Sequence, residues 1–332
     1  MDPVSTDLLN WYDAHRRVLP WRENPNVYWV WISEVMLQQT RVDTGLQYFG
    51  RFIARFPTVE DLARAPLDDV LTLWAGLGYY SRARNLHKAA QLVSEAGCFP
   101  SDLKGLRALP GVGEYMAAAI ASIALGLDEA TVDGNIARVM ARIHADLGPR
   151  KAMWAHARAH LPRGRAGDYN QALMDLGATI CTPKSPRCER CPVQSHCAGL
   201  LTGHPTSFPP PKVKKTVPIV PMNLTMHVQR DAVWVGRRPA QGLWAGLWAF
   251  PEAGEGQGRR IGAFEHVLSH KRLAVNVWVS EAPPPAPEPN WSGYGWVQPQ
   301  ELQNRGISAL TAKCLSLFHE DGTSRGDSHS RA

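Results

Sequence analysis

The chain has 332 residues, with 36 Lys and Arg against 30 Asp and Glu, a formal net charge of +6 at pH 7 and an isoelectric point near 9.1. This length is enough for two or more hydrophobic cores. The positive balance suits a polyanionic partner, but it is too modest to establish nucleic-acid binding by itself. No apolar run reaches membrane-spanning length, and the N-terminal stretch MDPVSTDLLNWYDAH has no features of a signal or transit peptide. We therefore expect a soluble, cytoplasmic protein.

The segment from residue 7 to residue 22 begins as a short amphipathic helix and ends in RVLPWR. The sequence alone favours a loop with an aromatic anchor. In the alternative, the tryptophan and the two arginines hold an extruded base and its phosphates through stacking and charge. The candidate binding residues of this segment are Arg17, Leu19, Trp21 and Arg22.

Residues 31–42, WISEVMLQQTRV, are predicted to form one helix, because apolar residues recur in them at helical spacing. Glu34 lies among large apolar neighbours in this helix. A glutamate in the middle of a helix is ordinarily a solvated surface residue. If its surroundings are buried, however, desolvation raises the carboxyl pKa and makes Glu34 available as a general acid near neutral pH.

Further helices are predicted over residues 47–56, 59–64, 67–74 and 82–94. Between the last two, the string GLGYYSRARNL is a glycine-marked junction that presents two tyrosines and two arginines. An aromatic side chain at such a corner is able to wedge into a base stack and offset part of the free energy of extruding a nucleotide. Tyrosine is equally ordinary core material, so the sequence leaves both roles open for Tyr79.

The densest chemical information lies in residues 109–135, LPGVGEYMAAAIASIALGLDEATVDGN. Pro110, Gly111 and Gly113 predict a hairpin before a small-residue helix at 114–125. A helix start with free N–H groups, made accessible by glycine, is suited to binding phosphate. The segment is interpreted as a helix-hairpin-helix clamp on a DNA strand, although a bare turn is favoured for the isolated motif.

Asp133 comes directly before apolar residues at helical spacing and is predicted to be the N-cap of the next helix. Taken alone, such an aspartate is a cap and has no further role. Its combination with the preceding hairpin and small-residue helix is what makes it a candidate for chemistry.

Four of the six cysteines crowd between residues 181 and 197, directly after a helix predicted over 169–182. Four thiolates in a compact loop indicate a metal site rather than the disulfide framework of a secreted protein. Zinc ribbons usually contain two C-x-x-C pairs, and only one is present here, so the ligand set favours an iron-sulfur cluster. The expected ligands are Cys181, Cys188, Cys191 and Cys197.

The composition changes at residues 201–221, where proline and lysine predict a stiff, extended connector. Beyond it, alternating apolar runs predict strands at 224–228, 232–235 and 274–279. Residues 319–332 are expected to form a disordered tail.

Together these motifs resemble the helix-hairpin-helix-GPD superfamily of DNA base-excision glycosylases, whose shared catalytic carboxylate corresponds to Asp133. The string SEVMLQQTRV is close to the signature of the MutY-type adenine glycosylases, and Glu34 matches their catalytic acid. The resemblance implies a multidomain protein: an all-α helix-hairpin-helix core of two helical lobes with an iron-sulfur loop, followed by a smaller α+β Nudix-like domain. It is strong from about residue 7 to residue 197 and weaker from 222 to 318.

The resemblance also implies domain boundaries. The catalytic region covers residues 1–200, and within it the helix-hairpin-helix lobe spans 23–130. Residues 1–22 and 131–200 form the cluster lobe, and the Nudix-like domain spans 222–318.

Position 115 divides this superfamily, because members that also cut the DNA strand carry a lysine there. Tyr115 cannot form an imine with the sugar, so the resemblance implies a monofunctional enzyme in which the tyrosine hydroxyl assists the sugar chemistry. It further implies that Tyr79 intercalates beside the damaged guanine and that Gln39 fills the space left by the flipped adenine. Gln171 corresponds to a residue that contacts this adenine, and Thr40 is a further candidate for DNA contact.

The resemblance makes the cofactor a [4Fe–4S] cluster with a structural and DNA-positioning role. In the C-terminal domain the glutamate motif that binds magnesium is absent, so pyrophosphatase activity is not expected. The Phe-Ser-His loop that recognises 8-oxoguanine in the family corresponds to Leu268, Ser269 and His270. Leu268 departs from the aromatic residue at the first position of this loop.

The expected function is removal of adenine mispaired with 8-oxoguanine, or less selectively with guanine, from double-stranded DNA. Glu34 would protonate the adenine, and Asp133 would stabilise the positive charge on the sugar. We expect a monomer in the bacterial cytoplasm that acts on nucleoid DNA and meets repair or replication proteins through its connector. The alternatives are an endonuclease III-like enzyme for oxidised pyrimidines and a mismatch-binding protein without catalysis.

Overall fold

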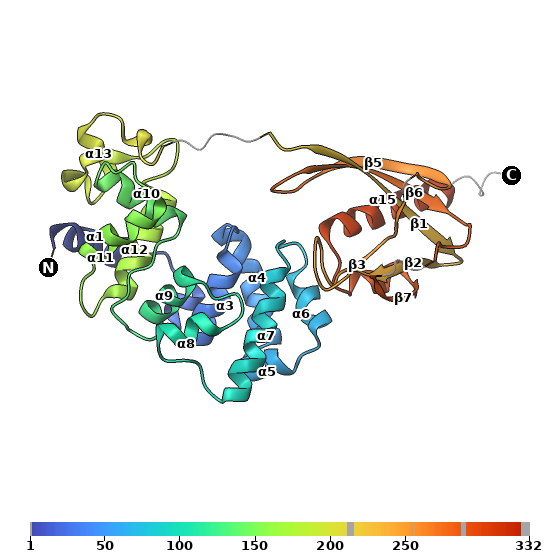
Figure 1. Ribbon diagram of the computed structural model, residues 1–332, viewed down its shortest axis with the longest axis horizontal. Coiled ribbons are helices and arrows are strands. Elements are labelled where there is room, and N and C mark those ends of the chain that lie inside the picture. The colour runs from blue at the N-terminus through green and yellow to red at the C-terminus, as the bar shows by residue number, and fades with distance from the viewer. Residues whose placement is uncertain (1, 211–215, 254, 287–289, 327–332) are drawn as a thin grey trace. The chain divides into compact units, whose positions relative to one another are not determined.

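The computed structural model describes residues 2–210, 216–253, 255–286 and 290–326 (Figure 1). The chain divides into two compact units, each built from two stretches of sequence. Unit 1 combines Met1–Ala63 with Lys88–Val213, and unit 2 combines Arg64–His87 with Lys214–Ala332. Residues 64–87 thus group with the C-terminal part of the chain. The boundaries expected from the sequence placed them in the helix-hairpin-helix lobe at 23–130.

Unit 1 is built from helices joined by short turns and loops. Its helices in chain order are α1 Pro3–His15, α2 Pro20–Glu23, α3 Val27–Leu37, α4 Val42–Arg55, α5 Val59–Arg64, α8 Leu103–Ala108, α9 Glu114–Ile123, α10 Gly134–Ile143, α11 Met153–Ala159, α12 Ala166–Thr179 and α13 Ala198–Leu201. Short 3₁₀ turns lie at Arg150–Ala152, Cys188–Arg190, Gln194–His196 and Pro205–Ser207. Helix α7, Ser81–Ala96, crosses the boundary between the units.

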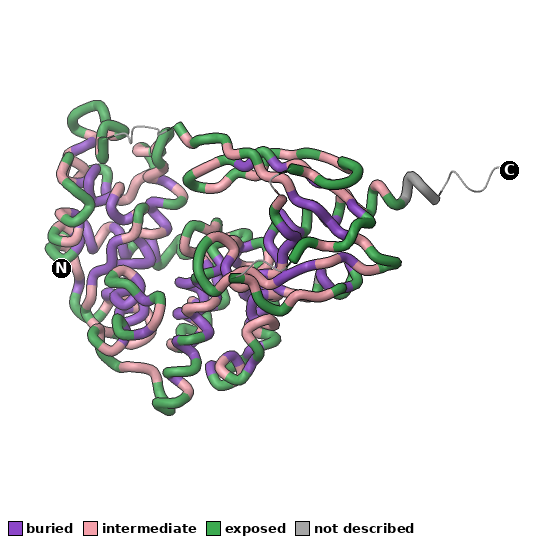
Figure 2. Tube along the Cα trace, turned by 45° about the vertical axis from the view of Figure 1, so that its right-hand side comes forward, coloured by how far each residue is buried: buried purple, intermediate pink, exposed green. Residues whose placement is uncertain are grey.

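One core of unit 1 forms where α12 packs between α1, α9 and α10. Leu8 and Tyr12 come from one face of α1, and Tyr169 and Leu173 come from α12; all four are almost fully buried. Figure 2 shows such buried stretches running through these helices. Burying a large apolar side chain stabilises the fold by about 1.5–3 kcal/mol, so this cluster fixes the position of the α10 N-terminus relative to α12.

The helix expected at residues 31–42 is shorter than predicted. Helix α3 ends at Leu37, and α4 begins at Val42. Between them Gln39 has a φ of 59°, the left-handed region that a continuous helix cannot accommodate. The apolar residues Val35 and Val42 lie seven positions apart, so their spacing mimics a single helix even though the chain turns between them.

Unit 2 contains an α+β region, as expected. Its strands are β1 Ile219–Gln229, β2 Ala232–Arg237, β3 Trp248–Ala249, β4 Glu252–Ala253, β5 Arg259–Val267, β6 Arg272–Ser280 and β7 Ser292–Val297. Its helices are α6 Leu67–Trp74, the beginning of α7, α14 Pro299–Gln303 and α15 Ala309–Gly326. The strand order is β3-β2-β1-β6-β5, with β4 beside β1 and β7 beside β2, and β1 runs parallel to β6.

The second core lies between the sheet and α15. Met226 from β1 and Val277 from β6 are fully buried, and Cys314 from α15 packs with them. The expected strands at 224–228, 232–235 and 274–279 are confirmed within β1, β2 and β6.

The disordered tail predicted over residues 319–332 is wrong in its first part, because α15 continues to Gly326 and residues 319–326 are helical. The apolar residues of α15 anchor it on the sheet, and the helix extends beyond them. Residues 327–332 of that tail, and residues 211–215 of the connector, lie outside the described part of the chain. Within the described ranges, no helix combines the length and apolarity needed to cross a membrane.

Candidate active site

Glu34 occupies a buried position on α3, where only 7 % of the residue is exposed. Its Oε2 accepts a 2.6 Å hydrogen bond from the Tyr115 hydroxyl. Burial raises the pKa of Glu34 from 4.5 to about 7, and nearby Asp133 adds to this effect. The hydrogen bond from Tyr115 and the charge of Arg22 act in the opposite direction. A pKa near 7 suits a proton donor near neutral pH. The sequence offered this role only if the surroundings of Glu34 are buried, and in the structure they are.

Asp133 is the N-cap of α10, as expected, and its Oδ1 accepts a 2.6 Å hydrogen bond from the Ile136 amide. Burial is the largest effect on Asp133 and raises its pKa above the ordinary value, while the amides of Ile136 and Asn135 partly offset this rise. Arg150 and Arg138 supply positive charge that also favours the carboxylate. Burial thus raises the pKa of both carboxyl groups, but only Asp133 accepts hydrogen bonds from backbone amides that limit the rise.

A cavity of about 140 Å³ in unit 1 joins these groups. The residues predicted from the sequence that line it are Arg17, Leu19, Trp21, Arg22, Glu34, Thr40, Tyr115, Asp133 and Gln171. The sequence did not single out other residues of its wall, which include Ser33, Asn135, Met174 and Ala178. The cavity therefore brings together the two predicted catalytic carboxyl groups and most of the predicted base-binding residues of unit 1.

Asp175 is a buried residue that the sequence analysis missed. Both of its oxygens accept hydrogen bonds from Arg22, at 2.7 and 3.0 Å, and Arg17 Nε donates to Oδ1 at 2.8 Å. Burial raises the pKa of Asp175, but the two guanidinium groups outweigh this and hold it below its ordinary value. For the segment that carries Arg17 and Arg22, the sequence favoured a loop, with binding of an extruded base and its phosphates as the alternative. In the structure both arginines are paired with the Asp175 carboxylate. The signal available in the sequence was the position of Asp175 among the apolar residues Leu173, Met174 and Leu176.

The glutamines predicted to contact the base occupy different surroundings. Gln171 is buried, lines the cavity and donates from Nε2 to the Gly167 carbonyl oxygen at 3.3 Å. Gln39 is exposed in the turn after α3, and it is not among the residues that line the cavity. Its left-handed backbone places it at a corner of the chain, and its predicted role in the opened base stack stays a prediction.

The predicted hairpin lies between α8 and α9. Gly111 has a φ of 81°, so glycine is required there, whereas Gly113 is the extended N-cap of α9. No side chain caps α9, and both glycines are exposed. The first amides of α9 therefore remain available for an anionic ligand, as a phosphate clamp needs.

The four cysteines between 181 and 197 line one pocket, together with Arg142 of α10. Burial raises the pKa of the Cys191 thiol to about 12 and also raises the pKa values of Cys188 and Cys197. Such thiols lose their protons when they bind iron. Arg142 supports this donor set, because its guanidinium donates to Cys181 Sγ at 3.3 Å and its carbonyl oxygen lies 3.4 Å from Cys197 Sγ.

Within the described ranges, no three His, Cys, Asp or Glu side chains converge to bind a single metal ion. A cluster binds each cysteine through a different iron, so its four ligands need not meet at one point. The residues present thus fit a [4Fe–4S] cluster, with Cys181, Cys188, Cys191 and Cys197 as its ligands.

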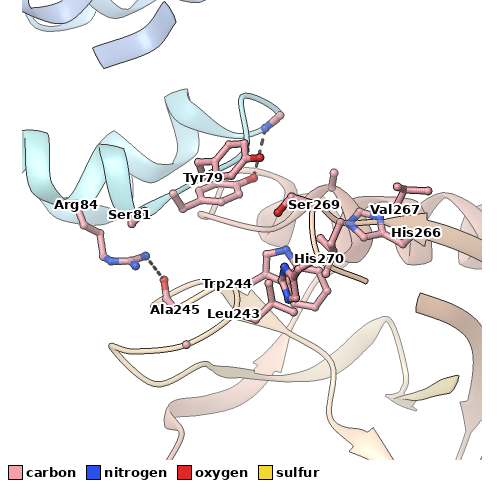
Figure 3. Close-up of a pocket in the computed structure, with 16 residues that line it drawn as sticks. Tyr79, Ser81, Arg84, Leu243, Trp244, Ala245, His266, Val267, Ser269 and His270 are labelled. Carbon is pink, nitrogen blue, oxygen red and sulfur yellow. Dashed lines mark hydrogen bonds between the residues drawn. The ribbon is translucent and has the colours of Figure 1, made fainter. Parts of the chain in front are cut away.

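Unit 2 contains a larger cavity of about 450 Å³ (Figure 3). Tyr79, at the N-terminal side of α7, lines it together with Leu268, Ser269 and His270 of the β5–β6 turn. Tyr79 is 47 % exposed, which contradicts a role as ordinary core. The residues expected to contact the opposite base thus share one cavity, which also includes the aliphatic Leu268.

The fold and these two cavities define the class as a helix-hairpin-helix protein of base-excision DNA repair. The sequence matches the HhH-GPD superfamily of base excision DNA repair proteins over residues 32–159. It also matches the iron-sulfur binding domain of endonuclease III over 181–197 and the NUDIX domain over 224–317. The chain belongs to the adenine DNA glycosylase family, as its similarity to full-length members shows.

Among these relatives, the adenine DNA glycosylase of Rattus norvegicus is 35 % identical and is matched over 96 % of this chain and 79 % of its own length. The adenine DNA glycosylase of Buchnera aphidicola subsp. Acyrthosiphon pisum is 36 % identical over 74 % of this chain and 73 % of its own. The solved structure of a thermostable thymine-DNA glycosylase is 30 % identical, with a TM-score of 0.55, and covers 60 % of this chain and 95 % of that chain.

Proposed function

We propose that this protein hydrolyses the N-glycosidic bond of adenine mispaired with 8-oxoguanine, and less selectively with guanine, in double-stranded DNA. The observation that carries the proposal is that Glu34 and Asp133 line one cavity with different surroundings. An acid that is protonated near pH 7 beside a carboxylate bound by backbone amides suits glycosidic cleavage.

The reaction begins with a proton transfer from Glu34 to N7 of the adenine. The bond between the sugar C1′ and N9 then breaks, its electron pair leaves with the adenine, and the sugar becomes oxocarbenium-like. Asp133 stabilises this positive charge as a carboxylate. Water adds to C1′ and gives its proton to Glu34 or Asp133, so the product is an abasic site.

The absence of a lysine at position 115 supports a monofunctional enzyme. A phenol cannot form the imine through which bifunctional members cleave the strand. Tyr115 instead donates a hydrogen bond to Glu34 and thereby orients the acid. Strand breakage therefore requires later treatment of the abasic site.

DNA binding follows from several separate features. The free amides of α9 after Gly111 and Gly113 contact a backbone phosphate, while Gln39 and Tyr79 occupy the opened stack. Ser269 and His270 hydrogen-bond the base opposite the adenine. The protein acts as a monomer on nucleoid DNA in the bacterial cytoplasm, and the connector at 201–221 contacts repair or replication proteins.

The proposal is tested by single-turnover cleavage of a duplex with one adenine opposite 8-oxoguanine, with and without alkali. We expect breaks only after alkali and their loss in Glu34→Gln, since a general acid contributes roughly 10²–10⁴-fold. The control is Glu60→Gln, which changes an exposed glutamate in α5. Tight binding without base release would instead indicate a binding protein, and breaks without alkali would contradict the role of Tyr115.

A further inference from the structure

Two aromatic residues with left-handed backbones line the cavity of unit 2. Tyr79 has a φ of 49° and Trp244 has a φ of 54°. A bulky side chain rarely adopts this conformation, because Cβ then crowds the neighbouring carbonyl oxygen. Such conformations persist where the surrounding structure imposes them, and they gather at ligand clamps.

The loop that carries Trp244 is held by its backbone carbonyl groups. Arg238 Nε donates to the Leu243 oxygen at 3.1 Å, Arg84 Nη1 to the Ala245 oxygen at 2.5 Å and Arg237 Nε to the Gly246 oxygen at 3.1 Å. The carbonyl oxygen of Trp244 itself accepts a 3.1 Å hydrogen bond from the Leu247 amide. Four consecutive carbonyl groups are thus bound, which fixes the strained backbone.

Glycine would meet the backbone requirement at position 244 without strain. Gly242 and Gly246 on either side also have positive φ values, of 91° and 71°. A tryptophan between them is explained by where its side chain lies rather than by the backbone.

The indole of Trp244 is half-buried and borders the cavity (Figure 3). It packs partly against the core of unit 2, and its ring meets the His266 ring edge to face, with centroids 5.7 Å apart. Tyr79 borders the same cavity from the other stretch of unit 2, and Ser269 and His270 contribute polar atoms. Leu268 adds only aliphatic surface.

We propose that Tyr79 and Trp244 form an aromatic clamp for one planar nucleobase, and that Trp244 contributes to binding the base opposite the excised adenine. The inference rests on the proposed function and adds a residue to its recognition site. A flat, uncharged heterocycle gains stacking from the aromatic rings, and its polar edge meets the side chains of Ser269 and His270.

The experiment measures dissociation constants for two duplexes that carry an uncleavable 2′-fluoro-2′-deoxyadenosine opposite either 8-oxoguanine or guanine. Trp244→Leu keeps an apolar side chain against the core but removes the flat ring, and Trp244→Phe keeps a ring. We expect Trp244→Leu to weaken the binding of both duplexes about tenfold and Trp244→Phe to retain most of the affinity. Trp296→Ala, which removes an exposed tryptophan outside the cavity, serves as the control and should leave both dissociation constants unchanged.

Trp244→Gly separates the ring from the backbone. It relieves the left-handed strain, so we expect its thermal midpoint to equal or exceed that of Trp244→Leu while DNA binding is weakened as in that variant. An unchanged dissociation constant in Trp244→Leu would overturn the clamp and leave the indole a packing role. If the unmodified protein excises no adenine from a cleavable duplex, the proposed function fails; if it excises adenine and Trp244→Leu binds as tightly, only the clamp fails.

Discussion

The Tyr115 hydroxyl donates a 2.6 Å hydrogen bond to Glu34 Oε2, across 81 positions of sequence. This contact joins α9, the second helix of the hairpin, to the buried α3. It stabilises the charged form of Glu34 and thereby opposes the burial that raises the pKa of the same carboxyl group. The two effects together set the pH at which the acid loses its proton.

Replacing Tyr115 by Phe should move the alkaline limb of the rate profile to higher pH. The proposed reaction requires protonated Glu34, so we expect the rate to fall as the pH rises through about 7. Without the donor hydroxyl the Glu34 carboxylate is less stable, so its pKa rises and the rate falls only at higher pH. Single-turnover rates measured across neutral pH check this expectation. A limb that moves to lower pH would show that the hydroxyl does not stabilise the Glu34 anion.

Glu34→Gln should stabilise the protein, and more so at alkaline than at acidic pH. The folded pKa of Glu34 is raised from 4.5 to about 7, so its favourable contribution is complete below the unfolded value and is lost as pH rises through 7. Glutamine is uncharged at every pH. The gain in free energy of unfolding from Glu34→Gln therefore increases with pH up to a limit on the order of 3 kcal/mol, at about 1.4 kcal/mol per pKa unit. Urea denaturation at pH 5 and pH 8 measures the free energy of unfolding of both proteins. An equal difference between them at the two pH values would contradict the raised pKa of Glu34.

Asp175→Asn should destabilise unit 1 strongly. Asp175 and Arg22 have side chains that are 2 % and 5 % exposed, so the change leaves a buried guanidinium without its counter-ion. Breaking such a pair costs about 3–5 kcal/mol. Asp13→Asn breaks a surface pair with Arg165 and should cost at most about 1 kcal/mol. Denaturant titration of both variants compares them, and equal losses would mean that burial does not decide the effect.

Cys191→Ser should abolish assembly of the iron-sulfur cluster. The thiol is one of four that line the pocket, and a hydroxyl is a harder and weaker iron ligand. We expect loss of the visible absorbance of the cluster and faster proteolysis of the loop at 181–197. Cys98→Ser changes an exposed cysteine outside this pocket and should retain both properties. Full iron content in Cys191→Ser would remove this residue from the ligand set.

The parts of the site that could be predicted from the sequence rest on local patterns. Asp133 was identifiable as a cap because the apolar spacing after it marks a helix start, and this depends on a few neighbouring residues. The large apolar neighbours of Glu34 on α3 made its burial one of two alternatives, and the structure decides for burial. The cysteine spacing indicated the cluster for the same reason, since the ligands lie within one short loop.

The remaining features depend on contacts between distant segments. Arg17 and Asp175 are 158 positions apart, and no local pattern indicates that their side chains meet. Strand β5 escaped prediction because its residues are exposed or only partly buried, so apolar alternation is weak. The strained backbone of Trp244 depends on hydrogen bonds from Arg84, which lies in the other stretch of unit 2.

The discontinuous build of unit 2 affects how the protein folds during synthesis. Tyr80 donates from its hydroxyl to the Ile307 carbonyl oxygen, and Asp68 pairs with Arg237, so the stretch at 64–87 finds its partners only near the end of the chain. At about 5–20 residues per second, a ribosome needs on the order of ten seconds to make the sequence between them. During this interval the side chains of Asp68 and Tyr80 lack these partners. The cavity of unit 2, which Tyr79 lines together with residues of the C-terminal stretch, is therefore completed only after that stretch has been made.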